Sequence, residues 1–302
     1  MTEQCPRVAI ILVTFKGKDD TLECLRSLAE LTYPNWEVLV VDQNSGDDTL
    51  EAVREAFPWA HTIANPVNNG FAGGNNVGIR AAMERGADYI FLLNNDTTVE
   101  PGLLEPLVAL AESDPKIGVV GPKMLYHGDP ETIWSAGGRM DWRGNSMLVD
   151  EGEKDTPGGE PRDVDFIVGC GLMARRDVLE KVGILDERYF IYYEESDLCA
   201  RIRKAGYRIV YQPNARLWHK VSRTFGPGSE FTVYYMYRNV FLYLRQHGAR
   251  PILGPLVALY KTLRLAAVWT VQGKHHRRWV LLRAVGDFCR GNFGKADIQF
   301  QK

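Results

Sequence analysis

Cysteine is scarce in this 302-residue chain, and its five cysteines are scattered without any Cys-x-x-Cys pair. An odd number of cysteines with such spacing argues against a disulfide framework and against a zinc site. We therefore expect a reduced, cytoplasmic setting. The N-terminus enters an apolar run almost at once, so we expect no signal peptide.

Net charge is also small, because 36 Lys and Arg stand against 38 Asp and Glu and leave −2. By charge alone such a chain is not a nucleic-acid binder, and we expect no nucleic-acid partner. A long uncharged apolar run is missing as well. The one candidate, 252–271, carries Lys261 and Arg264 at its centre, and each would cost about 2.5–3.5 kcal/mol in a membrane-spanning helix.

Two common nucleotide-binding signatures are absent. The glycine-rich stretch 68–78 has glycines at 70, 73, 74 and 78, which does not fit Gly-x-Gly-x-x-Gly, and no Gly-x-x-x-x-Gly-Lys-Ser/Thr loop occurs. The stretch still precedes an expected helix, whose first N–H groups suit a diphosphate. A flexible turn is the alternative interpretation.

What is present is a regular alternation of strand-like and helix-like segments over the first 120 residues. Apolar runs predict strands at 8–14, 37–42, 60–65, 88–93 and 117–120. Helical patterns fall between them, one starting after Asp19 and Asp20 and others at 47–56, 73–85 and 101–113. This order predicts an α/β fold with a Rossmann-like, mostly parallel sheet flanked by helices.

Polar clusters follow three of these strands: Thr14-Phe15, the run from Asp42 to Ser45, and Asn94-Asn95-Asp96. Ligands bind beyond the carboxyl ends of strands in such sheets, so three clusters on one edge favour a binding site over isolated helix caps. Asp42 is suited to accept the N–H of a pyrimidine base. Asp96 is a hard oxygen ligand suited to Mg²⁺ or Mn²⁺, and the two asparagines suit a ribose or the waters of a metal.

The second half carries an acidic cluster, Glu194, Glu195 and Asp197, before an expected helix at 198–205. These carboxylates can offset a helix dipole, and Asp197 can form an ordinary i,i+4 pair with Arg201. An expected strand at 210–219 ends in His219, which is usually a structural position. Ser222, Arg223 and Thr224 follow in a glycine-rich loop that could close over a diphosphate.

Loops and short strands are expected at 126–163, a region that includes Trp134, a residue that could stack on a sugar or lock a loop. A strand is expected at 165–168. The small residues from Gly169 to Gly171 come next, where backbone could approach a ligand closely.

The segments VAIILVTFKGKDDTLECLRSL, VLVVDQNSGDDT, NNGFAGGNNVGI, LLNNDTTVEPGLL and VGCGLMARRDVLEKVGILDERYFIYYEESDLCARIRKAGYRIVYQPNARLWH together resemble glycosyltransferase family 2, especially bacterial rhamnosyltransferases of cell-surface polysaccharide synthesis. The resemblance runs in collinear order over residues 7–245. It implies a GT-A fold, a nucleotide-sugar donor, Mg²⁺ or Mn²⁺ as cofactor, and inversion at the anomeric carbon.

The resemblance also implies roles for single residues. It places the nucleobase on Asp42 and the metal on the Asn94-Asn95-Asp96 motif, where asparagine replaces the first aspartate of the usual pattern; His219 joins Asp96 as a metal ligand. The expected donor-binding residues are Thr14, Phe15, Asp42, Asn44, Asn69, Gly73, Asn75, Asn94 and Asn95. Gly169, Gly171 and Trp134 are expected on the acceptor side.

Transfer to a hydroxyl needs a base that accepts its proton. In the family this base is an aspartate, and the matching position here is Glu195, with Glu194 and Asp197 as alternatives. The donor would be a dTDP- or UDP-linked sugar, rhamnose by analogy, and the acceptor a glycan or a polyprenyl-diphosphate-linked saccharide. A non-catalytic nucleotide-sugar-binding scaffold and a nucleotidyltransferase are the rival interpretations.

The C-terminal part differs in charge. Eleven Lys and Arg against two Asp give the segment 245–302 a formal excess of +9. We expect a glycosyltransferase domain at 1–245, with a donor half at 1–122 and an acceptor half at 123–245, and an amphipathic basic helical region at 246–302. This region is expected to bind an anionic membrane surface, at the inner face of the cell membrane. A homodimer interface or a solvated face is the alternative.

Overall fold

A ten-stranded mixed sheet forms the centre of the computed structural model, which describes residues 5–221 and 228–301. Its main path runs β10-β12-β6-β11-β4-β1-β2-β3. The parallel part consists of β1 (Val8–Thr14), β2 (Trp36–Asp42), β3 (His61–Ala64) and β4 (Tyr89–Asn94). β11 (Gly171–Arg175) then runs antiparallel to both β4 and β6 (Ile117–Tyr126).

The far side of the sheet is built on a long strand, β12 (Arg208–His219), which runs parallel to β6. Short strands complete this side: β5 (Thr97–Val99), β7 (Asp129–Ser135) and β10 (Arg162–Asp163). β5 pairs with β12 and thereby places Thr97 opposite His219. A separate hairpin joins β8 (Gly138–Met140) to β9 (Ser146–Leu148).

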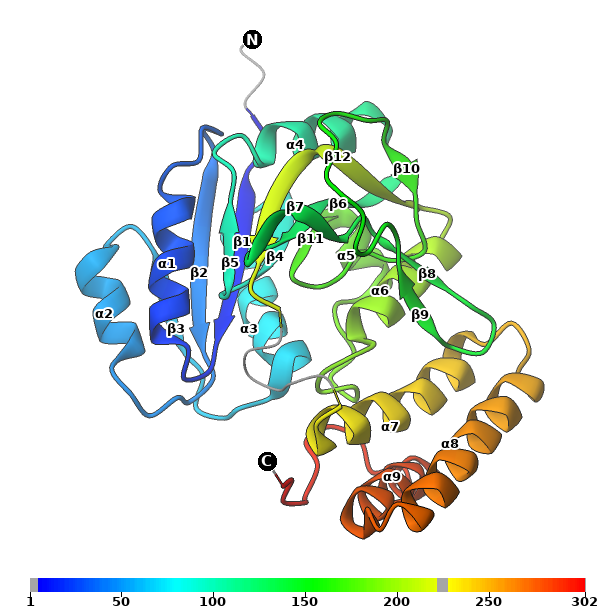
Figure 1. Cartoon of the computed structure of the whole chain (residues 1–302). Helices are drawn as coiled ribbons and strands as arrows, with labels where there is room; N and C mark the ends of the chain where they lie inside the picture. The colour runs from blue at the N-terminus through cyan, green and yellow to red at the C-terminus, as the bar shows by residue number, and fades with distance from the viewer. Residues whose placement is uncertain (1–4, 222–227, 302) are drawn as a thin grey trace.

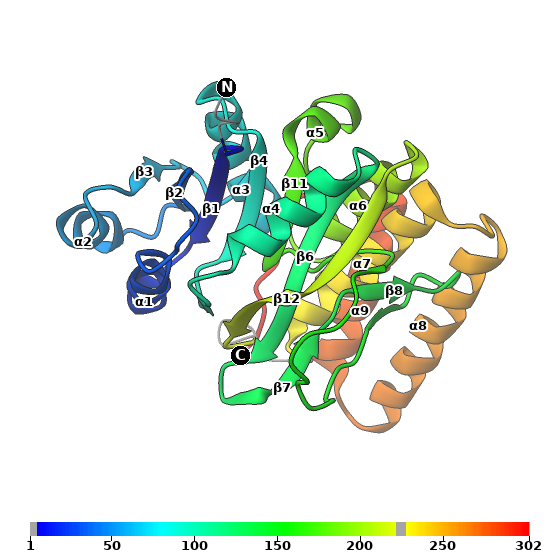
Figure 2. The same cartoon turned by 90° about the horizontal axis from the view of Figure 1, so that it is seen from above.

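Helices cover the sheet because the crossovers between its parallel strands are helical (Figures 1 and 2). The helices of the sheet part are α1 (Lys18–Leu28), α2 (Thr49–Ala56), α3 (Gly70–Glu84), α4 (Leu104–Ser113), α5 (Arg176–Val182) and α6 (Glu194–Lys204). α3 packs tightly on the sheet: a Cβ atom at Gly78 would lie 2.3 Å from the Ile11 side chain. The predicted α/β fold is thus confirmed.

The expected strand at 165–168 is wrong. That segment contributes a single bridge, from Phe166 to Gly138, whereas the strand β11 begins at Gly171. Gly171 is small because of the core, not because of a turn. A Cβ atom there would lie 2.8 Å from Leu217 and 3.0 Å from Met124.

Three C-terminal helices form a layer of their own: α7 (Glu230–His247), α8 (Leu253–Val271) and α9 (His275–Arg290) (Figure 1). Asp287 of α9 is buried and accepts hydrogen bonds from Tyr234 of α7 at 2.8 Å and from Arg283 at 2.7 Å. Within the described ranges, no helix is long and apolar enough to cross a membrane. The boundary expected at residue 245 stays a prediction, and α7 runs across it.

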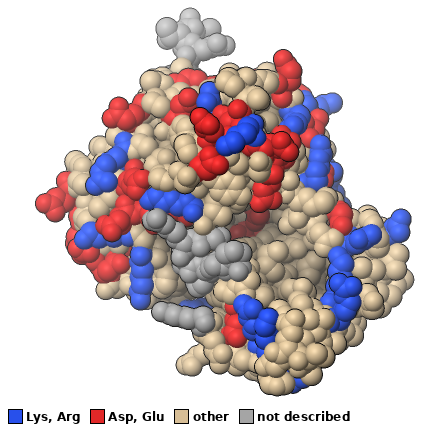
Figure 3. Space-filling view, viewed as in Figure 1, with Lys and Arg blue, Asp and Glu red and all other residues tan. Residues whose placement is uncertain are grey.

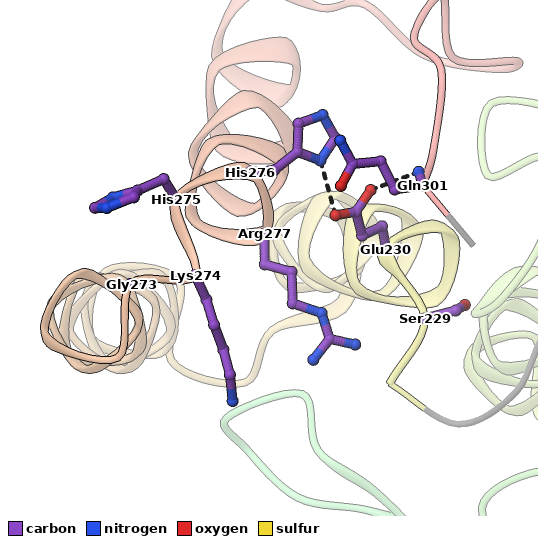
Figure 4. A pocket seen from close by; sticks show the side chains of 8 residues that line it. All are labelled: Ser229, Glu230, Gly273, Lys274, His275, His276, Arg277 and Gln301. Carbon is purple, nitrogen blue, oxygen red and sulfur yellow. Dashed lines mark hydrogen bonds and ion pairs between the residues drawn. The ribbon is translucent and has the colours of Figure 1, made fainter.

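The start of α9 and the C-terminal residues are tied to the start of α7 (Figure 4). Glu230 is buried, its Oε1 lies 2.7 Å from Nδ1 of His276, and its Oε2 accepts the backbone N–H of Gln301 at 2.7 Å. A polar cavity of about 370 Å³ opens beside these contacts. The loop expected to close over a diphosphate, Ser222 to Thr224, lies outside the described residues.

Candidate active site

The carboxyl ends of β1, β2 and β4 meet at one edge of the sheet, as the sequence predicts. Thr14 is paired with Asp42, and Val13 with Asn94. Asp42 is buried and accepts the backbone N–H of Ser45 at 3.0 Å together with its hydroxyl, which fixes the carboxylate at the strand end. Asn44 follows in the left-handed region, with φ at 59°.

Phe15 is one of the few exposed large apolar side chains of the sheet part, at 42%. Its neighbour Thr14 is buried, and the Thr14 hydroxyl accepts a hydrogen bond from Thr21 of α1 at 3.0 Å. Of the two donor contacts expected in this cluster, the Phe15 side chain is therefore exposed, whereas the Thr14 side chain is buried at the end of β1.

Gln43 links this edge to the start of α3. Its Oε1 accepts from the Asn65 amide at 2.7 Å and from the backbone N–H of Asn69 at 3.4 Å, and its Nε2 donates to the carbonyl of Gly70. Gly73 leaves room for Asn69, since a Cβ atom there would lie 2.4 Å from the Asn69 Cβ. The glycine-rich stretch therefore forms the ordered start of a helix rather than a flexible turn.

Two asparagines expected to contact the donor have structural partners instead. Asn75 is buried, and its amide donates to the Phe71 carbonyl within α3 at 2.9 Å. Asn95 turns its amide into α1, where it donates to the Thr21 hydroxyl at 3.0 Å and to the Gly17 carbonyl at 3.3 Å. Neither side chain is among those that line the cavity described below, and their role in donor binding stays a prediction.

Asp96 and His219 come together from distant parts of the chain. Nε2 of His219 lies 3.1 Å from Oδ1 of Asp96 and 3.3 Å from the Asn94 amide nitrogen. The Asp96–His219 pair has the distance of an ion pair, yet Oδ1 of Asp96 and Nδ1 of His219 are buried without a well-aligned hydrogen-bond partner in the described part of the chain. Burial opposes ionisation of Asp96, but His219 holds the pKa of that carboxyl below its usual value.

This pair fits a divalent metal that takes its other ligands from a diphosphate and water. Its Asp96 carboxylate oxygen is left unsatisfied, and the imidazole beside it is the commonest nitrogen ligand of metals. Three or more His, Cys, Asp or Glu side chains placed to hold a metal occur nowhere in the residues described. The described side chains at this edge therefore do not form a complete set of metal ligands by themselves.

A cavity of about 380 Å³ opens between this pair and the start of α6 (Figure 3). Asp96, His219 and Trp134 line this cavity together with Glu194 and Glu195. Trp134 packs its ring on His219, with ring centroids 4.5 Å apart. The expected acceptor-side tryptophan thus lies beside the expected metal ligand.

Glu195 is the carboxylate with the properties of a base. Its side chain is half-buried, and burial raises its pKa to about 7, against the opposing effect of the helix N–H groups. Glu194 is almost fully buried, and burial followed by the charge of Glu195 raises its pKa well above the usual value. Of the two, Glu195 has access to solvent and titrates near neutrality.

Asp197 is held in contacts within the fold, and its place among the candidate bases stays a prediction. It is completely buried and does not line the cavity. Arg201 donates to its Oδ2 at 2.8 Å, and Nε2 of His247 lies 2.7 Å from its Oδ1. Both oxygens are therefore occupied in an ion-pair network that joins α6 to α7.

The two glycines expected on the acceptor side lie in different surroundings. Gly169 lines the cavity, and a Cβ atom there would lie 2.9 Å from the Phe71 ring and 3.8 Å from Cβ of Glu195. Gly171 faces the core, as described above, and contributes packing rather than an acceptor contact.

The loop before α6 is held in an unusual backbone conformation that sequence reasoning missed. Phe190, Tyr192 and Tyr193 all have φ between 67° and 75°, a region costly for large side chains. Asn239 of α7 supports the loop by donating to the carbonyls of Tyr189, Ile191 and Tyr192 at 2.8–2.9 Å. The signal in the sequence that could have indicated this support is the polar pair Arg238-Asn239 inside the apolar helix α7.

The fold is that of the GT-A class of glycosyltransferases, and one cavity is lined by a carboxylate and imidazole pair at the strand ends and by carboxylates at the start of α6. The family model described as glycosyl transferase family 2 matches residues 9–183, and the chain belongs to this family.

Two curated relatives show how far the likeness extends. The chain is 27% identical over 273 residues to N-acetylglucosaminyl-diphospho-decaprenol L-rhamnosyltransferase of Mycobacterium tuberculosis, covering 82% of this chain and 87% of that protein. It is 31% identical over 236 residues to O-antigen biosynthesis protein RfbC of Myxococcus xanthus. That match covers 72% of this chain and only 17% of the relative.

A solved structure supports the fold. GalNAc-T7, crystallised with UDP, GalNAc and Mn²⁺, superimposes with a TM-score of 0.65 at 18% identity. The match covers 81% of this chain and 51% of GalNAc-T7. At this identity the likeness establishes the GT-A fold alone.

Proposed function

We propose that this protein is an inverting, metal-dependent rhamnosyltransferase that transfers the sugar of a dTDP- or UDP-linked donor to a polyprenyl-diphosphate-linked saccharide. The observation that carries the proposal is that Asp96, His219 and Glu195 line one cavity. The name of the mycobacterial relative supports the sugar and the acceptor. Cell-surface polysaccharide synthesis is the corresponding process.

In this mechanism Asp42 accepts an N–H group of the nucleobase, and Phe15 and Asn69 border the donor. Asp96 and His219 would hold Mg²⁺ or Mn²⁺, which would supply positive charge that stabilises the departing nucleoside diphosphate. Glu195 takes the proton of the acceptor hydroxyl, whose oxygen forms the new bond to the anomeric carbon as the bond to the diphosphate breaks. A single displacement of this kind inverts the anomeric centre.

The same proposal includes binding at the inner, cytoplasmic face of an anionic membrane. Leu253, Leu256, Tyr260 and Leu263 form an exposed apolar face on α8, and Trp279 of α9 is exposed as well. Residues 245–302 carry the +9 excess, and Figure 3 shows Lys and Arg along the border of this otherwise uncharged surface. Apolar area beside basic side chains suits an anionic lipid surface.

Transfer assays with a panel of donors and a lipid-linked acceptor test the proposed function. Purified protein would be incubated with dTDP-rhamnose or UDP-sugars, Mn²⁺, and an N-acetylglucosaminyl-diphospho-prenol in neutral detergent, and products would be identified by mass spectrometry. We expect one added deoxyhexose and an inverted linkage by NMR. Glu195→Gln should remove the product, whereas Glu180→Gln on the exposed face of α5 should not. Absence of transfer with every donor would refute the proposal.

A further inference from the structure

A second cavity, of about 180 Å³, adjoins the candidate active site on the side of the helical layer. It lies between the loop joining β8 to β9 and helices α7 and α8. The two cavities share Tyr193 and Met236 among their lining residues, so they lie next to each other. The charged and amide side chains that line this second cavity are Arg143, Asn145 and Lys261.

The loop that carries Arg143 and Asn145 is fixed in place. Asp141 accepts the backbone N–H of Arg143 at 2.8 Å and the Asn145 amide at 2.6 Å. The Tyr193 hydroxyl donates to the carbonyl of Gly144 at 2.8 Å. Since Tyr193 precedes Glu194 directly, the loop is tied to the segment that positions the base.

The two cations of this cavity lack a matching anion. Lys261 is half-buried and donates to Oδ1 of Asn145 at 3.2 Å, and the Arg143 guanidinium stacks on the Trp142 ring at 5.0 Å. Neither forms an ion pair with a carboxylate of the described residues. Asp141 is the neighbouring acid, but its oxygens are engaged with backbone and amide N–H groups.

Two like charges at one cavity repel each other unless an anion lies between them. Arg and Lys are the side chains that bind phosphate oxygens in proteins. A diphosphate carries enough negative charge to satisfy both, and the Asn145 amide, which donates one N–H to Asp141, has a second N–H that can donate to a further oxygen.

These features correspond to the groups of a lipid-linked saccharide. Glu195 lines the first cavity, Arg143 and Lys261 line the adjoining second one, and α8, which carries Lys261, also carries the exposed Tyr260 and Leu263. In a lipid-linked saccharide, the sugar, the diphosphate and the prenyl chain follow each other in this order.

We propose that Arg143, Asn145 and Lys261 form the subsite for the diphosphate of the acceptor. This rests on the proposed function, in that the acceptor is a saccharide linked through a diphosphate to a lipid. The subsite sets acceptor specificity, because it distinguishes a diphosphate-linked saccharide from a neutral glycoside of the same sugar.

The test compares two acceptors in neutral detergent: N-acetylglucosaminyl-diphospho-farnesol and the octyl glycoside of N-acetylglucosamine. For the variant Arg143→Gln/Lys261→Gln we expect KM for the diphosphate acceptor to rise at least tenfold. KM for the donor and turnover of the octyl glycoside should be unchanged. The matched control, Arg264→Gln, removes a cation from the outer face of α8 and should behave as wild type.

Each remaining outcome contradicts the subsite. An unchanged KM for the diphosphate acceptor, or equal losses with both acceptors, overturns it while wild-type transfer leaves the proposed function standing. Wild-type protein that transfers to neither acceptor overturns both. If the double variant loses only its sedimentation with anionic vesicles, the two cations serve a phospholipid headgroup, and the acceptor subsite is again overturned.

Discussion

Asn239 of α7 donates a 2.8 Å hydrogen bond to the carbonyl of Tyr192, a residue held at a φ of 69° just before the carboxylate cluster of α6. The same amide reaches two further carbonyls of this loop. A helix outside the family-model match of residues 9–183 therefore sets the backbone from which Glu195 projects.

Replacing this amide should disturb the base more than the donor site. For Asn239→Ala we expect turnover to fall at least tenfold, with KM for the donor near its wild-type value, and a loss of stability of about 1–3 kcal/mol from the unpaired carbonyls. Steady-state kinetics and thermal unfolding measure both. Gln246→Ala removes a hydrogen bond from the same helix to Tyr189 and should retain turnover. Equal donor and turnover losses in Asn239→Ala would contradict this.

Removing the base should abolish turnover without loss of donor affinity. Glu195→Gln keeps the size of the side chain and its place at the start of α6, so we expect turnover to drop about 10²–10⁴-fold, the usual contribution of a general base. Binding of the nucleoside diphosphate, measured by calorimetry, should be unchanged. A fully active Glu195→Gln variant would exclude this residue as the base.

The pH dependence follows from the same carboxyl. A base must be ionised, and the pKa of Glu195 is raised to about 7, so turnover should rise as pH increases through about 7 and then level off. The stability of the fold changes with pH in the opposite direction. Because the folded protein holds this proton more tightly than the unfolded chain, the free energy of unfolding should fall as pH rises from about 4.5 to about 7. Glu195→Gln should show a smaller fall in unfolding experiments, and an identical pH profile would contradict this assignment.

The metal site is tested by ligand-dependent stabilisation. Mn²⁺ together with a nucleoside diphosphate should raise the melting temperature of wild-type protein, because a ligand stabilises the state that it binds. Asp96→Asn should lose this increase and at least 100-fold of transfer. His219→Ala should weaken the Mn²⁺ dependence, with half-saturation at a higher concentration. Asp129→Asn, an exposed carboxylate on β7, is the control. A full Mn²⁺ response in Asp96→Asn would count against the site.

The membrane proposal is tested on the apolar face of α8. Leu256→Gln/Leu263→Gln changes two exposed side chains, so the fold should be retained. We expect wild-type protein to sediment with anionic vesicles, poorly with neutral ones, and less at high salt, and the variant to remain in the supernatant. If the variant instead sediments like wild type but loses a dimer in analytical ultracentrifugation, the face is an interface between two copies of the chain.

Local patterns in the sequence were sufficient for the parallel half of the fold and for part of the site. Uninterrupted apolar runs place β1, β2 and β4, and polar residues at their ends place Asp42 and Asp96, because strand-end positions follow from the strands themselves. The direction of a side chain does not follow in this way. Asn95 stands between two cavity residues yet turns into α1, since Gly17 and Thr21 offer it hydrogen bonds there.

Long-range pairings explain the other differences. The sequence left Asp197 as an alternative to Glu195, and only the packing of α7 against α6 brings His247 to it. The small residues at 169–171 suggested a turn, but Gly171 is small because Leu217 and Met124, from two other strands, pack against it. Neither contact can be derived from the segment that contains the residue.

α7 has one more consequence for how the molecule works. It holds the loop before Glu195 through Asn239, lines both cavities with Met236, and is joined to α9 through Tyr234 and Asp287. In the proposed function, catalysis and membrane binding therefore share one helix, so that the enzyme and its anchor are not separable parts. Under the same proposal, contacts that α8 and α9 make at a membrane reach the base through α7, and docking is coupled to readiness for transfer.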